Sequence, residues 1–139
     1  MTSYETLYER ALSKITDPTL AMLTDEDLEN MLYGWLMSAV AKMRKCSSDL
    51  TDRDEEAKQF NADLTDVEQE ILAILITREW LAPQLTSVLT TSQVFSGKET
   101  NFFAQANHLN TLQALDEKLK IEAQQLSRDY TYAKNEYFD

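Results

Sequence analysis

The feature that most constrains the fold is a run of six apolar residues, ILAILI, at positions 71–76. The run lies within DLTDVEQEILAILITREWLA, which predicts a helix over about residues 66–82. Thr65 and Glu68 have the spacing of a capping box at its start. Because six consecutive apolar residues cover the whole circumference of a helix, we expect this helix to lie centrally, covered on several sides.

Two segments before this helix have the apolar periodicity of helices that could cover it. The first predicted helix covers about residues 3–15, and Thr2 and Glu5 have the spacing of a capping box at its start. The second covers about 25–46, with Thr24 as its N-cap and acids in its first turn.

The pattern after Pro83 is less uniform, and this proline should end or kink the central helix. Residues 84–98 contain alternating and β-branched side chains, which are compatible with a short hairpin or an extended connection. A fourth helix is predicted over about 101–129 and would span on the order of 40 Å. The polar stretch after the second helix predicts one short helical turn, around 54–60.

The chain has 139 residues, enough for one domain with a sizeable core. It contains only two glycines and two prolines, a composition typical of long helices with few tight turns. We therefore predict an all-α fold: a small helical bundle over 1–129 with a long C-terminal helix, followed by an extended aromatic tail at 130–139.

The formal net charge is −11, and residues 24–70 hold thirteen acids against five bases. A surface of this charge repels phosphate, which argues against tight binding of nucleic acid. No apolar stretch approaches the roughly 18 residues that a membrane helix needs, so we expect a soluble intracellular protein that binds no membrane.

Catalytic and metal-binding patterns are scarce. His108 and Cys46 are the only residues of their kinds and have no recognisable flanking motif, so the default for both is structural. One acidic stretch, DRDEEAKQFNAD, matches a calcium loop in part, at Asp52, Asp54, Glu56 and Asp63. Ala57 replaces the glycine of that loop, and Phe60 stands where a ligand is expected. A solvated acidic loop is the favoured interpretation, and we predict no metal, no cofactor and no enzyme activity.

The last ten residues concentrate aromatic side chains: Tyr130, Tyr132, Tyr137 and Phe138. Tyr130 continues the apolar stripe of the fourth helix, whereas the other three do not. Ten extended residues reach at most about 33–36 Å, enough to contact a second protein. Aromatic residues are common in interfaces, so we predict a docking arm. The alternative is a tail that folds back across its own bundle.

The order of the segments resembles that of the small neck proteins of long-tailed bacteriophages, the head–tail connector or adaptor proteins. The resemblance covers most of the chain and includes the phrases EWLAPQL, ANHL and DYTY. It implies a helical subunit in a homo-oligomeric ring, typically of twelve copies, beneath the portal in the virion neck, assembled in the host cytoplasm. DNA would pass through the ring without specific binding.

In such proteins the C-terminal segment commonly reaches the portal, while the opposite face accepts the next neck or tail-completion protein. Carried onto this chain, the portal-binding residues would be Tyr130, Tyr132, Tyr137 and Phe138. Two other hypotheses stay open: a small acidic regulatory or inhibitory protein that covers a partner's basic surface, and an enzyme that uses the acidic loop with a divalent ion.

Overall fold

The structure is a computed structural model. It describes the backbone of residues 1–15, 17–43, 46, 48–94 and 99–138, and the side chains of these except at 18–19, 87–109 and 131–138. Four α-helices, one 3₁₀ helix and three short strands occur in this part of the chain: β1 (Thr2–Ser3), α1 (Tyr4–Leu12), η1 (Pro18–Met22), α2 (Asp25–Lys42), β2 (Arg53–Asp54), β3 (Gln59–Phe60), α3 (Asp66–Val94) and α4 (Glu99–Phe138).

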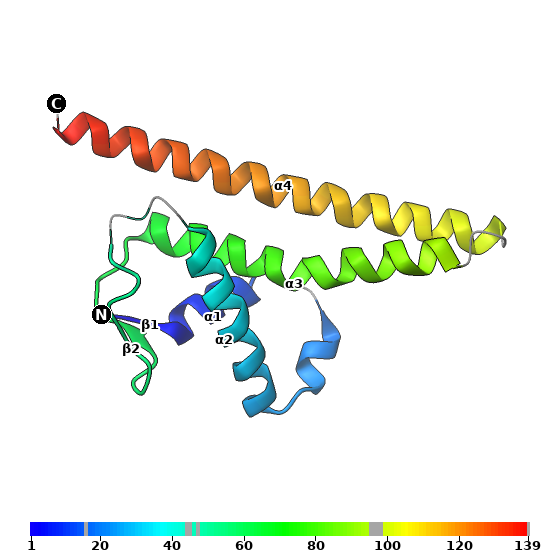
Figure 1. Ribbon diagram of the computed structural model, residues 1–139, viewed down its shortest axis with the longest axis horizontal. Helices are drawn as coiled ribbons and strands as arrows, with labels where there is room; N and C mark the ends of the chain where they lie inside the picture. Colours follow the sequence, from blue (N-terminus) through cyan, green and yellow to red (C-terminus); the bar gives the residue numbers. More distant parts are fainter. Residues whose placement is uncertain (16, 44–45, 47, 95–98, 139) are drawn as a thin grey trace.

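Helix α3 lies at the centre, as the ILAILI run predicts. The helices α1, α2 and α4 all pack against it, with α4 on one side and α1 and α2 on the other (Figure 1). Five of the six residues of the run are buried: Ile71, Leu72, Ala73, Ile74 and Ile76. The predicted capping box is also confirmed, because the Thr65 amide donates to Glu68 Oε1 at 3.0 Å and the Glu68 amide donates to Thr65 Oγ1 at 3.2 Å.

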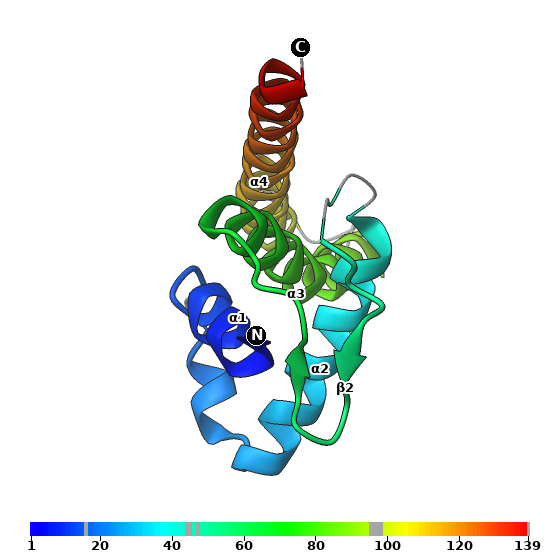
Figure 2. The ribbon, with the colours of Figure 1, turned by 90° about the vertical axis from the view of Figure 1, so that its left-hand side faces the viewer.

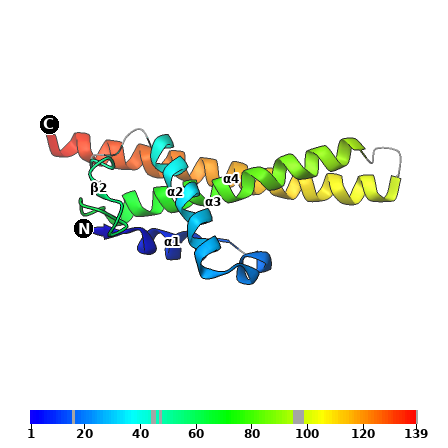
Figure 3. The same ribbon diagram turned by 60° about the horizontal axis from the view of Figure 1, so that its bottom comes forward.

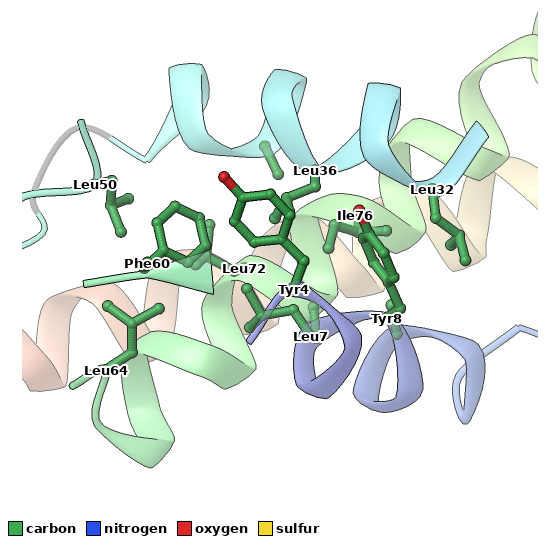
Figure 4. Packing of buried hydrophobic residues seen from close by; sticks show 13 residues of the cluster. Tyr4, Leu7, Tyr8, Leu32, Leu36, Leu50, Phe60, Leu64, Leu72 and Ile76 are labelled. Carbon is green, nitrogen blue, oxygen red and sulfur yellow. The ribbon is translucent and has the colours of Figure 1, made fainter. Parts of the chain in front are cut away.

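The buried apolar residues form two clusters that share α3. The inner cluster joins α3 to α1, α2 and the sheet (Figure 4) and consists of Tyr4, Leu7, Tyr8, Ala11, Leu32, Leu36, Ala39, Leu50, Phe60, Leu64, Leu72, Ala73 and Ile76. The α4 cluster joins α3 to α4 and consists of Ile15, Ile74, Trp80, Leu81, Leu112, Leu119 and Ala123. Trp35 and Leu75 pack against both, so the two clusters are continuous.

The all-α prediction is incomplete, because the three strands form a small antiparallel sheet in the order β1-β3-β2. Phe60 pairs with Thr2 on one side and with Arg53 on the other. The helical turn expected around 54–60 is a hairpin: Asp54 accepts hydrogen bonds from the amides of Glu56 and Ala57, at 3.0 and 3.1 Å. An aspartate that binds the backbone two and three residues ahead favours a turn over a helix.

Because of the sheet, the first helix begins with a different N-cap than the sequence predicts. Thr2 lies in β1, and its hydroxyl contacts Ala62 and Leu64, so the expected Thr2–Glu5 capping box is wrong. Ser3 is the N-cap instead and accepts from the amide of Thr6. For α2 the N-cap is Thr24, as predicted, while the helix ends at Lys42 rather than near 46.

Helix α3 passes through Pro83 and continues to Val94, so residues 84–94 are neither a hairpin nor an extended connection. Residues 95–98 of that prediction lie outside the described residues. Packing against α4 explains the continuation, since Leu81 is fully buried and Leu85 contacts the α4 cluster. The Arg78 guanidinium also pairs with Asp116 of α4 at 3.0 Å. Tertiary contacts of this kind outweigh local propensity.

Figures 1 and 3 show α3 and α4 running side by side well past α1 and α2. Helix α4 has 40 residues and spans on the order of 60 Å. Within the described residues, no helix combines the length and the apolar character needed to span a bilayer.

Candidate docking surface at the C-terminal end of α4

The predicted docking arm is helical. Helix α4 continues to Phe138, so the extended tail expected after Tyr130 is wrong. Figures 1 and 2 show its last turns beyond the start of α3 and apart from α1, α2 and the sheet. Eight helical residues, 131–138, advance only about 12 Å at 1.5 Å per residue, whereas the same residues fully extended could reach slightly more than twice as far.

The structure places the first of the four predicted site residues against the chain's own bundle. Tyr130 is half-buried, and its hydroxyl donates to Glu68 Oε2 at 3.3 Å. Its position continues the stripe formed by Leu119, Ala123 and Leu126, as the sequence predicts. Tyr132, Tyr137 and Phe138 lie in the last turns of α4, and their side chains fall outside the described residues. Their role stays a prediction.

Glu68 holds this end of the molecule together, although only 1% of its surface is exposed. Its Oε1 accepts hydrogen bonds from the Thr65 amide at 3.0 Å and the Ser48 hydroxyl at 3.3 Å. Its Oε2 accepts from the Cys46 thiol at 2.8 Å and from Tyr130. We call these five residues the Glu68 network. It joins the start of α3 to α4 and to the connection that follows α2.

The network favours the ionised carboxylate. Burial alone would raise the pKa of Glu68, but the hydrogen bonds from Cys46, Thr65 and Ser48 outweigh burial and hold the pKa below its usual value. The position in the first turn of α3 acts in the same direction, because the N-terminal end of a helix dipole attracts negative charge. A charged Glu68 therefore fixes where α4 leaves the bundle.

In the network, donors from different segments of the chain converge on one acceptor. The Cys46 thiol and the Ser48 and Tyr130 hydroxyls all donate to the Glu68 carboxylate, which is a weak base for the thiol because hydrogen bonds hold its pKa below the usual value. Cys46 also packs against the inner cluster. The structural role predicted for Cys46 thus includes a hydrogen bond that the sequence did not indicate. The side chain of His108 lies outside the described residues.

The acidic stretch at 52–63 contains the β2–β3 hairpin. The Asp52 carboxylate accepts from the side-chain amide of Asn61 at 2.9 Å, Asp54 caps the turn, and Asp63 pairs with the N-terminal amino group. These carboxylates thus serve different partners. In the part of the chain that the structure describes, no three histidine, cysteine, aspartate or glutamate side chains gather as they would around a metal ion.

No family model, no curated protein and no solved structure matches this chain. A relation to the phage neck proteins therefore stays a prediction.

Sequence reasoning found Tyr130 and the capping pair Thr65–Glu68 but missed the network that links them. The capping-box spacing indicates that Glu68 caps the helix, but it does not indicate that the side chain is buried. Cys46 and Ser48 carry no local signal at all, because they meet Glu68 only after α2 and α3 pack together.

Proposed function

We propose that this protein is a structural component of a bacteriophage neck, a head–tail adaptor that forms a ring beneath the portal and surrounds the DNA channel. The observation that carries the proposal is the C-terminal end of α4, which leaves the bundle as a projecting helix whose last ten residues include three tyrosines and a phenylalanine. It acts by binding and has no catalytic role.

The Glu68 network divides the proposed arm into an anchor and a docking segment. Tyr130 is the anchor, because its hydroxyl is bonded within the subunit. The docking segment is 131–138, with Tyr132, Tyr137 and Phe138 as its aromatic contacts to the portal. Since the segment is helical, it would lie in a groove of the portal rather than add a strand to a sheet.

Two further features suit a ring. The α3–α4 pair is elongated, and α4 packs against α3 along one side, which leaves its other side available to a neighbouring subunit. Ile121 on α4 is 51% exposed. Repeated head-to-tail contacts of one subunit with the next close into a ring when their rotation closes. The net charge of −11 would let duplex DNA pass without tight binding.

The test removes residues 131–139 and retains Tyr130, so that the Glu68 network stays complete. The full chain and the shortened chain are each mixed with purified portal, and binding is measured by sedimentation and by electron microscopy. We expect the shortened chain to keep the unfolding midpoint of the full chain and to lose portal binding. Equal binding by both chains would contradict the docking role.

Light scattering of the complex tests the ring itself. A particle with many copies of this chain supports the adaptor. A complex of one copy with one nucleic-acid-binding protein, weakened steeply by salt, would instead support the acidic regulatory alternative.

A further inference from the structure

A groove of about 430 Å³ lies between α1 and the start of α2, and the turn of the β2–β3 hairpin closes one end of it. Its floor is apolar and is formed by Leu12, Leu28, Leu32 and the ring of Tyr8. This volume is in the range of small-ligand sites in proteins, and the neck proposal makes no use of the groove.

Tyr8 gives the groove a polar group without a partner. The residue is 7% exposed, and within the described residues no hydrogen bond reaches its hydroxyl. Figure 4 shows the hydroxyl directed from α1 toward α2. Burial and the nearby charge of Glu29 raise the pKa of Tyr8, so the hydroxyl is neutral at physiological pH. A buried hydroxyl without a partner is costly, and a ligand in the groove could satisfy it.

The rim of the groove is acidic. Four carboxylates surround it, from Glu5, Glu9, Asp25 and Glu29, against one ammonium group, Lys58. Lys58 pairs with Glu29, so the other three carboxylates make the electrostatic potential of the groove negative. A concave site with one sign of charge concentrates ligands of the opposite sign.

We propose that this groove binds a lysine- or arginine-bearing segment of another protein. The alkyl stem of the basic side chain and the apolar residues next to it would cover the leucine floor, as long basic side chains commonly do. The cationic head would then reach the rim carboxylates and donate a hydrogen bond to the Tyr8 hydroxyl. A bare metal ion fits less well, because within the described residues no three carboxylates, those of the rim included, gather as the ligands of one ion.

The proposal is independent of the neck function and is tested on the isolated full chain. The probe is a fluorescein-labelled peptide of alternating leucine and arginine, followed by fluorescence polarisation and by amide chemical shifts. We expect saturable binding with shift changes in the first halves of α1 and α2. A matched peptide with glutamate in place of arginine should not bind, and spermidine should bind at least about tenfold more weakly than the peptide.

Two variants locate the site. Tyr8→Phe removes only the hydroxyl, and E9Q/D25N removes two rim charges. Each variant should bind the peptide about tenfold more weakly, which is the size of effect expected for hydrogen bonds and contacts to a charged group. The control E26Q/E117Q removes two exposed charges outside the groove, one of them in the same first turn as Asp25, and should bind like the natural chain. Thermal unfolding confirms that each variant is folded.

Three results would overturn the inference. One is equal binding of the arginine peptide by E9Q/D25N and by the control. The second is equal binding of the glutamate peptide. The third is binding of spermidine as tight as that of the peptide, which would identify a site for small free cations instead of a protein segment.

Discussion

Glu68 is buried, yet its carboxylate accepts hydrogen bonds from groups on three segments of the chain. An amide at this position retains one acceptor oxygen, but its NH₂ group would face donors and leave some of them unsatisfied. We therefore expect Glu68→Gln to lower the free energy of unfolding by about 1–3 kcal/mol. Urea denaturation measures the change, and Glu117→Gln, an exposed acid on α4, is the control that should stay within about 0.5 kcal/mol of the natural chain.

Glu68 should also make the free energy of unfolding depend on pH. Hydrogen bonding holds the folded pKa of Glu68 below its usual value, so folding favours the ionised form. Its contribution is complete above the unfolded pKa of about 4.3 and is lost as the pH falls through the lower folded value. Urea denaturation between pH 7 and 3 should show the natural chain losing more stability than Glu68→Gln. Parallel curves would indicate that Glu68 is not ionised in the folded protein.

Tyr130 allows the α4 end of the network to be tested alone. Tyr130→Phe removes the hydroxyl that donates to Glu68 and keeps the ring, so we expect a loss of about 1 kcal/mol. Hydrogen exchange should show faster exchange of the amides around residue 130 with little change in α1. Unchanged exchange there would mean that the ring, and not the hydroxyl, holds this turn.

At the scale of elements, Pro83 lies on an exposed turn within α3. A proline inside a helix removes one backbone hydrogen bond and crowds the preceding turn, at a cost of about 3 kcal/mol, part of which is recovered because proline restricts the unfolded chain. Pro83→Ala should therefore raise the free energy of unfolding by about 2 kcal/mol in urea denaturation. Ala82→Gly, at the exposed neighbouring position, should lower it by about 1 kcal/mol. A destabilised Pro83→Ala would show that α4 packs only against a bent α3.

The elements that sequence reasoning predicted are those whose signals are local. The ILAILI run indicates a central helix by itself, and the Thr24 and Thr65 caps act within three residues. The strands could not be predicted, because β3 pairs with β1, a strand far from it in the sequence. Thr2 lies opposite Phe60 in this pair. The β-branched stretch after Pro83 is helical because α4 covers α3, a contact that no local pattern encodes.

The same distinction applies to the candidate site. Tyr130 was predictable from its place in the stripe of α4. Its partner was not, because Glu68 lies 62 residues earlier in the chain, and the other side-chain donors, Cys46 and Ser48, lie 22 and 20 residues from Glu68. Such distant contacts depend on the packing of three helices and leave no periodic trace in the sequence.

At the scale of the whole molecule, the two clusters differ in how they are enclosed. The inner cluster lies between α1, α2, α3 and the sheet, whereas the α4 cluster lies mainly between α3 and α4. An element that packs on one side only can open without global unfolding. We therefore expect amides in the described middle of α4, residues 110–130, to exchange with solvent faster than those of α3 at 71–81.

Two substitutions separate this local opening from global unfolding. Leu36 is fully buried in the inner cluster, so Leu36→Ala should cost about 2–5 kcal/mol and accelerate exchange throughout the chain. Leu119 lies in the α4 cluster, so Leu119→Ala should accelerate exchange mainly in α4 and leave α1 and α2 protected. Equal acceleration everywhere by Leu119→Ala would mean that both clusters unfold as one unit. In the proposed neck assembly, a separately opening α4 would gain protection when the ring forms, because the neighbouring subunit would cover the side that α3 leaves exposed.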